Sequence, residues 1–145
     1  MRLWHVALLP YLPDAQFKGQ LRELVAIMHD WRDRGKTNHL LVNKVMAYPK
    51  EELVLYFIEY SHEWRIRYQK DISEKICSEF FAFAAADNSV GPVYRTWHNR
   101  KYLRVCMANL YEKYFFGVGS SRITKQQWDR LAEGYKRITG QAYRL

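Results

Sequence analysis

The residue types that could do chemistry in this chain stand near its start: the α-amine of Met1 and the carboxylate of Glu23. An α-amine has a pKa of about 7.7–8.0, against about 10.4 for a lysine side chain, so at neutral pH a useful fraction of it is an unprotonated nucleophile. Such an amine can form a Schiff base with a sugar aldehyde. Removal of an initiator methionine generally needs a small second residue, and Arg2 is large. We therefore expect Met1 to be retained and to carry the amine.

The carboxylate must be positioned by a helix that runs from Asp14 to a stop at Gly35. Apolar residues recur at helical spacing through this stretch, and glycine is the common residue just past a helix end. Pro10 and Pro13 separate the helix from the residues before it. We expect residues 1–13 to form an extended N-terminal arm.

Arg22 and Glu23 fall on the side of this helix away from its apolar stripe. Gly19 and Ala26 lie between them in projection, so the face is a small-residue floor edged by a cation and a carboxylate. Such a face would let another backbone come close. The alternative interpretation is that Arg22 and Glu23 are a solvated helix surface.

The rest of the chain predicts further helices. Residues 40–46 are consistent with either a short helix or a strand. Pro49 opens a helical pattern that runs to Tyr68 and restarts after Lys70–Ser73, and residues 87–92 read as a loop. Pro92 is expected to open a long helix ending near Gly117. Thr124 and Gln127 have the spacing of a capping box, which opens a last helix that stops at Gly140.

These patterns predict an all-α fold. We expect residues 1–145 to form a single compact domain of four to five helices with the extended N-terminal arm.

Arg100 and Arg104 follow Trp97 at spacings of three and four residues, so arginines and aromatic rings share a stripe of the predicted helix. Guanidinium groups interleaved with rings suit phosphate contact and base stacking. The alternative, equally supported by the pattern, is that the rings belong to the core and the arginines extend to solvent.

Composition favours a polyanionic partner. The net charge is +8, and residues 91–145 carry eleven Lys and Arg against three Asp and Glu. Five scattered histidines form no ligand pair, so no metal and no cofactor is expected. Cys77 and Cys106 are expected to be free thiols, and no apolar run reaches the length of a membrane span. We expect a cytoplasmic monomer.

The sequence resembles the bacterial branch of the pyrimidine-dimer DNA glycosylases, relatives of the phage enzyme endonuclease V. The similarity rests on four short stretches in order: Met1-Arg2-Leu3-Trp4-His5, Tyr11-Leu12-Pro13, Gly19-Gln20 with Arg22-Glu23-Leu24, and Asn38-His39-Leu40-Leu41-Val42-Asn43-Lys44. It is densest over residues 1–60 and continues more loosely to about residue 85.

The resemblance implies a nucleoid-associated bacterial or phage enzyme of DNA base excision repair. It would act on double-stranded DNA carrying a damaged pyrimidine, cleaving the glycosidic bond and then nicking the strand as an abasic-site lyase. By position, Met1 corresponds to the family's amine nucleophile and Glu23 to its catalytic carboxylate.

The expected DNA-binding residues come from the same motifs and from the arginine stripe. Where the phage enzyme has a further arginine this chain has Ala26, so some contact must come from elsewhere. The expected DNA-binding residues are Arg2, Arg22, Asn38, His39, Lys44, Arg100 and Arg104. A second hypothesis, from another functional class, is a non-catalytic basic helical module that binds DNA or RNA.

Overall fold

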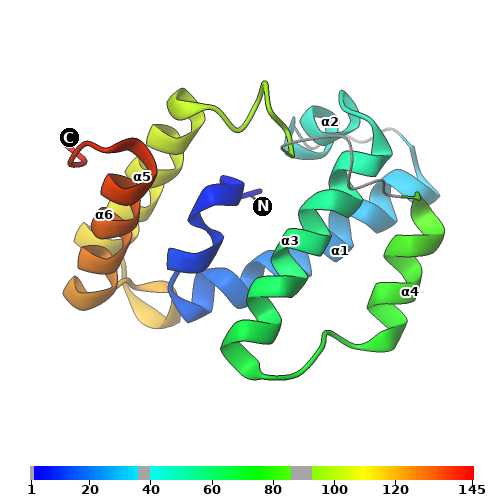
Figure 1. Ribbon diagram of the computed structural model, residues 1–145, viewed down its shortest axis with the longest axis horizontal. Helices are drawn as coiled ribbons and strands as arrows, with labels where there is room; N and C mark the ends of the chain where they lie inside the picture. The colour runs from blue at the N-terminus through cyan, green and yellow to red at the C-terminus, as the bar shows by residue number, and fades with distance from the viewer. Residues whose placement is uncertain (1, 36–39, 86–92) are drawn as a thin grey trace. The chain divides into compact units, whose positions relative to one another are not determined.

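The computed structural model describes residues 2–35, 40–85 and 93–145, and the predicted all-α fold is confirmed. The described residues contain six α-helices, two 3-10 helices and no strand (Figure 1). The chain divides into two compact units, one made of Met1–Leu3 with Gln20–Arg95 and the other of Trp4–Gly19 with Thr96–Leu145. The expectation of a single domain over residues 1–145 stays a prediction.

The boundary between the units falls inside helix α1, Asp14–Asp33. The first unit holds α1 from Gln20 onward together with three helices: α2 Leu40–Met46, α3 Lys50–Tyr68 and α4 Glu74–Phe83. The second unit holds four elements: η1 Val6–Tyr11, α5 Arg100–Phe115, η3 Gly119–Ser121 and α6 Lys125–Thr139. Residues 40–46, which the sequence left open, are helical.

The core of the first unit is centred on the first half of α3. Five successive residues, Leu53–Phe57, are buried, as in a helix that is surrounded on all sides. The ring of Phe57 stacks on that of Phe80 from α4, with centroids 4.0 Å apart, and Figure 1 shows α3 and α4 side by side. Leu24, Ile27 and Met28 bury the facing side of α1.

The predicted restart between α3 and α4 is confirmed. Gln69 ends α3 in the left-handed conformation (φ 53°), and its N–H donates to the carbonyl of Arg65. Ser73 then caps α4, because its side chain accepts a hydrogen bond from the Ile76 N–H. The five residues between the helices, 69–73, therefore belong to neither.

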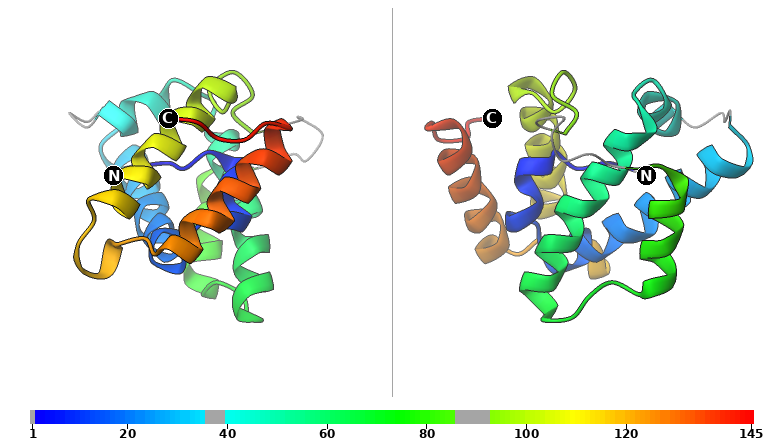
Figure 2. Two further views of the ribbon diagram at one scale, coloured as in Figure 1. Left: turned by 90° about the vertical axis from the view of Figure 1, so that its left-hand side faces the viewer. Right: turned by 45° about the vertical axis from the view of Figure 1, so that its right-hand side comes forward.

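In the second unit, α6 packs against both η1 and α5, and α5 and α6 lie side by side in both views of Figure 2. The Thr124–Gln127 capping box is present with both reciprocal hydrogen bonds, and Gly140 ends α6 in the left-handed conformation (φ 76°). Both predictions for this helix are confirmed.

The extended arm is wrong for residues 6–11, which form η1. His5 caps this turn by accepting a hydrogen bond from the Ala7 N–H, and the Val6 N–H donates to Nδ1 of His98. Pro10 fits inside because its fixed φ matches that of a 3-10 helix. Leu12 and Pro13 do separate this turn from α1, as predicted, but the prolines do not keep residues 6–11 extended.

The long helix expected to open at Pro92 is also wrong in its start. Residues 93–99 form turns, and Tyr94 has a positive φ of 51°. The helix α5 begins only at Arg100, where the side chain of Asn99 accepts from the Tyr102 N–H. A side-chain cap here competes with continued helix and fixes the boundary eight residues after the proline.

Cys77 and Cys106 are free thiols, as expected. Within the described ranges no helix is long and apolar enough to cross a membrane.

Gly134→Ala tests the packing of α6 on η1. Alanine normally stabilises a helix interior relative to glycine by about 1 kcal/mol. Here the added Cβ would lie 2.4 Å from the ring carbon Cγ of Tyr11, so we expect a loss of about 1–3 kcal/mol from this overpacking. Urea denaturation measures the loss, and the same change in a Tyr11→Ala background should cost less. An equal loss in both backgrounds would contradict the packing argument.

His98 gives the second unit a pH-dependent stability. Burial lowers the pKa of His98 to about 3, and burial also lowers the pKa of His5, whose ring lies 5.1 Å away. The pKa of a histidine in the unfolded chain is about 6.5, so below that pH the unfolded chain binds more protons than the folded chain. Stability therefore falls as the pH falls toward 3.

The variant His98→Asn should therefore show a shallower loss of stability between pH 7.5 and pH 5 in urea denaturation. The matched control His62→Asn, at an exposed position, should keep the wild-type slope. Identical slopes for all three proteins would show that His98 is not the group responsible.

Candidate active site

The start of the chain is held against helix α1 by backbone hydrogen bonds. The N–H of Arg2 donates to Oε2 of Glu23 across 2.9 Å, and both residues belong to the first unit. Leu3, the next residue, is fully buried. The chain beside Glu23 is therefore held at the Arg2 N–H and, one residue later, by the burial of Leu3.

A buried glutamine completes this arrangement. Nε2 of Gln20 donates to the carbonyl oxygen of Arg2 across 2.8 Å and lies 3.3 Å from Oε2 of Glu23. On its other side, Oε1 of Gln20 accepts a hydrogen bond of 3.3 Å from the hydroxyl of Tyr56 on α3. Gln20 and Tyr56 are fully buried. The network fixes both the backbone of Arg2 and the carboxylate.

The spacing within α1 explains why these groups meet. Residues three apart share a helix face, so Gln20 and Glu23 both reach the backbone of the same residue, Arg2. Both hydrogen bonds to Glu23 go to Oε2, and Oε1 has no hydrogen-bond partner within the described part of the chain. The site therefore presents one anchored and one available carboxylate oxygen.

The solvated-surface interpretation is wrong for Glu23 and holds for Arg22. Glu23 is half-buried under the backbone of Arg2, so another stretch of chain does approach this face, as the small-residue floor predicted. Arg22 is exposed and has no ion-pair or hydrogen-bond partner among residues 2–35, 40–85 and 93–145.

Among the other predicted site residues of the first unit, Arg2 and Lys44 lie within the described residues. Met1, Asn38 and His39 lie outside the described residues. Arg2 is half-exposed, while Lys44 on α2 is exposed with its ammonium 5.7 Å from the ring centroid of Tyr48.

Arg100 and Arg104 belong to the second unit and are exposed on α5. Arg100 donates to the carbonyl oxygen of Thr139 across 3.3 Å, and Arg104 donates to the Tyr135 hydroxyl across the same distance. Trp97 is buried and precedes the helix, so the predicted continuous stripe of rings and guanidiniums is broken at its start.

Sequence reasoning missed the roles of Gln20 and Tyr56. A signal for Gln20 was present, since it is a polar residue one turn before the candidate carboxylate and next to the apolar residue Leu21. Tyr56 carries no such signal, because it lies inside the apolar run 53–57 and reads as core.

Fold and site together define a class: an all-α protein that holds a single carboxylate against the first residues of its chain. The family model described as pyrimidine dimer DNA glycosylase matches residues 1–75, more than half of the chain, and the protein belongs to that family. The family description implies a DNA glycosylase with DNA as its substrate. No curated protein and no solved structure matches the chain.

Gln20→Leu tests the buried network. The change leaves the Tyr56 hydroxyl and the Arg2 carbonyl each without this partner, and a buried unsatisfied polar group costs about 1–3 kcal/mol. We expect a loss of that size in urea denaturation. The control Gln126→Leu, at an exposed position of α6, should stay within about 0.5 kcal/mol of wild type. Equal effects at the two positions would argue against the network.

Proposed function

We propose that this protein is a DNA repair glycosylase with abasic-site lyase activity, in which the α-amine of Met1 attacks and Glu23 assists. The substrate is double-stranded DNA carrying a pyrimidine dimer or another damaged pyrimidine. The hydrogen bond from the Arg2 N–H to Glu23 carries the proposal. Membership of the pyrimidine dimer DNA glycosylase family supports the substrate class.

Covalent geometry links that hydrogen bond to the amine. The α-nitrogen of Met1 is three bonds from the Arg2 nitrogen, so whatever the conformation of residue 1 the two nitrogens are within roughly 4 Å. The Arg2 nitrogen is itself 2.9 Å from the Glu23 carboxylate. The amine is the nucleophile of a Schiff-base mechanism and the carboxylate is its proton-transfer group. Because the amine is tethered so close to the carboxylate, both can reach one substrate.

The proposed chemistry runs through an imine. The amine attacks C1′ of the damaged nucleotide, the bond from C1′ to the base breaks, and the electron pair leaves with the base. Opening of the sugar ring then gives a protonated imine, which acidifies the hydrogens on C2′. Loss of a C2′ proton breaks the bond from C3′ to its phosphate oxygen by β-elimination, and water finally releases the amine.

Glu23 would serve two of these steps. Its negative charge stabilises the cationic sugar that forms as the base leaves, and its oxygen Oε1, which has no partner in the described structure, can carry a proton. Positioned proton transfer is typically worth about 10²–10⁴-fold in rate. Gln20 and Tyr56 act as positioning residues, because they orient the carboxylate and the Arg2 backbone.

DNA binding would draw on the cations around this site. Arg22 is exposed without an acidic partner in the described structure, and Arg2 lies at the anchored backbone itself. Asn38, His39 and Lys44 are proposed as further contacts of the same unit. A bulky lesion weakens base stacking locally, so bending the duplex and flipping a nucleotide costs less there.

Glu23→Gln is the direct test of the carboxylate. Glutamine keeps a side-chain oxygen that can accept from the Arg2 N–H, so fold and DNA binding should persist. With dimer-containing duplex, base release should fall by about 10²–10⁴-fold. The control Glu59→Gln, an exposed glutamate on α3 with the same charge change, should retain full activity. Unchanged turnover in Glu23→Gln would remove Glu23 from the mechanism.

Borohydride trapping separates the enzyme from the binding module. Reduction converts an imine between protein and sugar into a stable secondary amine, so wild-type protein incubated with abasic DNA and borohydride should become covalently linked to it. Acetylation of the α-amine should abolish the linkage and preserve salt-sensitive DNA binding. Salt-sensitive binding with no linkage by the unmodified protein would favour the non-catalytic module.

A further inference from the structure

A pocket in the second unit has an unusual charge environment. It has a volume of about 510 Å³ and is lined by Arg104, Tyr135, Gln141, Ala142 and Arg144. The lining contains two arginines and no carboxylate. It lies outside residues 1–75, the part matched by the family model.

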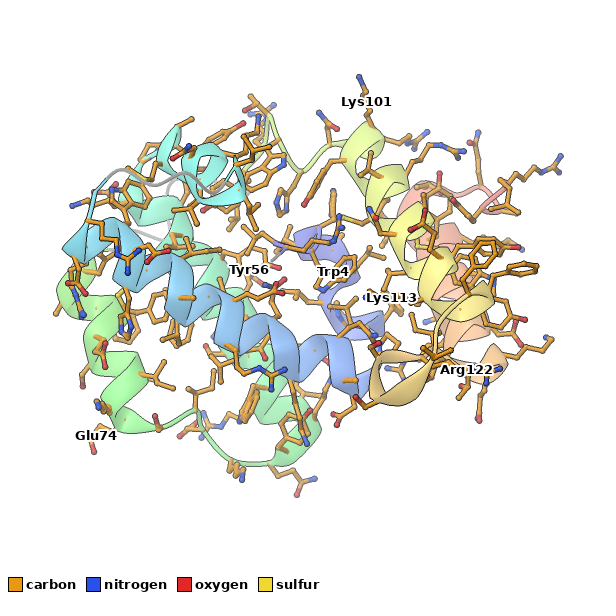
Figure 3. All side chains as sticks on the ribbon, turned by 180° about the vertical axis from the view of Figure 1, so that it is seen from behind. Trp4, Tyr56, Glu74, Lys101, Lys113 and Arg122 are labelled. Atoms are coloured by element: carbon orange, nitrogen blue, oxygen red, sulfur yellow. The ribbon has the colours of Figure 1, made fainter. Side chains whose placement is uncertain are left out.

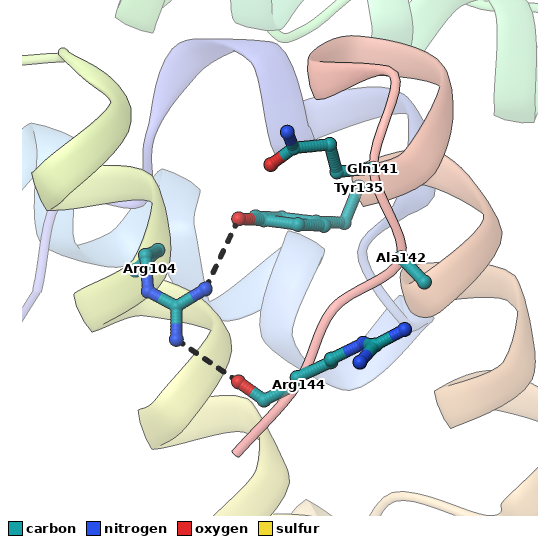
Figure 4. A pocket seen from close by; sticks show the side chains of 5 residues that line it. All are labelled: Arg104, Tyr135, Gln141, Ala142 and Arg144. Carbon is teal, nitrogen blue, oxygen red and sulfur yellow. Dashed lines mark hydrogen bonds between the residues drawn. The ribbon is translucent and has the colours of Figure 1, made fainter.

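The guanidinium of Arg104 is held in place by neutral groups. Nη1 donates to the hydroxyl of Tyr135 across 3.3 Å and Nη2 to the carbonyl oxygen of Arg144 across 2.9 Å (Figure 4). The same guanidinium lies 5.4 Å from the ring centroid of Tyr143. Its orientation is therefore fixed from three sides without any neutralisation of its charge.

Several other arginines are neutralised instead. Arg32, Arg67 and Arg137 each pair with a carboxylate within 3.4 Å. Arg104 and Arg144 have no acidic partner within ion-pair distance in the described part of the chain. Arg100, one turn before Arg104, bonds only to the carbonyl oxygen of Thr139 within the same ranges. Positive charge thus accumulates here without local compensation.

Polar donors complete the pocket. The Tyr135 hydroxyl accepts from Arg104 and keeps its own proton to donate, and Figure 4 shows the Gln141 amide lying beside the Tyr135 ring. The remaining N–H groups of Arg104 have no partner among the described residues. Orientated guanidinium, hydroxyl and amide donors around one cavity are the chemistry that recognises a phosphate oxygen.

We propose that this pocket binds a backbone phosphate of double-stranded DNA. The inference rests on the proposed function for its ligand and adds a phosphate site outside the family-matched part of the chain. The alternative source of the same chemistry is a free phosphate ion. Nucleic acid is favoured because the charge continues beyond the pocket, with Lys101 and Lys136 exposed on the same two helices. Figure 3 shows Lys101 extending outward from α5.

Two variants with the same charge change test the pocket. Gln141→Glu puts a negative charge in it, while Gln126→Glu puts one on an exposed position of the same unit, at the start of α6. The probe is an undamaged duplex, followed by fluorescence anisotropy over a series of salt concentrations. We expect Gln141→Glu to weaken binding about three- to tenfold at low salt and Gln126→Glu to change it less than twofold. Equal weakening by both would overturn the proposal.

Arg104→Gln gives the complementary test. The plot of log K against log salt concentration has a negative slope, and loss of one phosphate contact should make that slope less negative by about 0.9, whatever the DNA sequence. The control Arg137→Gln, whose side chain is paired with Glu133, should leave the slope within error. Circular dichroism verifies folding, and if Arg104→Gln does not fold, the glutamine pair decides alone. An unchanged slope in a folded Arg104→Gln protein would overturn the proposal.

Two further readouts separate the failure modes. Inorganic phosphate titrated alone tests for a free-anion site. Saturable binding of phosphate to the pocket, together with an affinity of Gln141→Glu for DNA equal to that of the wild type, would overturn the DNA assignment. Borohydride trapping on abasic DNA should proceed alike with the wild-type protein and with Gln126→Glu, whose substitution lies outside the pocket. A wild-type protein that shows the Gln141-dependent affinity but no trapping would refute the enzymatic proposal and leave the phosphate site standing.

Discussion

The hydrogen bond between the Arg2 N–H and the Glu23 carboxylate is the constraint on which the candidate site depends. Its strength comes from its setting, because a carboxylate that accepts from a backbone N–H forms a charge-assisted bond and does not have to order a flexible partner. Gln20 reinforces it from the buried side by bonding both members of the pair. The start of a chain usually frays, but here the backbone of Arg2 is fixed, and only three covalent bonds separate its nitrogen from the α-nitrogen of Met1.

The site contains both groups that are held by hydrogen bonds and groups that have no hydrogen-bond partner in the described ranges. Oε2 of Glu23, Gln20 and Tyr56 are committed to structure, whereas Oε1 of Glu23 and the side chain of Arg22 have no partner in the described ranges. A reactive group held by buried hydrogen bonds on helices keeps its geometry while the substrate changes. In the second unit Arg104 is likewise held by hydrogen bonds, and because both of these partners are neutral its charge is not compensated by them.

The sequence predicted those parts of the fold that depend on local rules. The all-α class, the break after Tyr68, the capping box at Thr124 and the stop at Gly140 follow from periodicity and from side-chain caps. The start of α5 at Arg100 and the turn η1 were missed, since both depend on competition between local alternatives that proline alone does not decide. Gln20 and Tyr56 were missed because their roles arise from a contact between residues 36 apart.

The central claim is that the amine beside Glu23 is the nucleophile, and peptide mapping of the reduced complex tests it most directly. Wild-type protein is trapped on abasic DNA with borohydride, digested, and the peptide that carries the sugar remnant is identified by mass spectrometry. The account predicts a remnant on the α-nitrogen of Met1. A remnant on a lysine side chain, such as Lys44, would contradict it, as would trapping that persists after the α-amine has been selectively blocked.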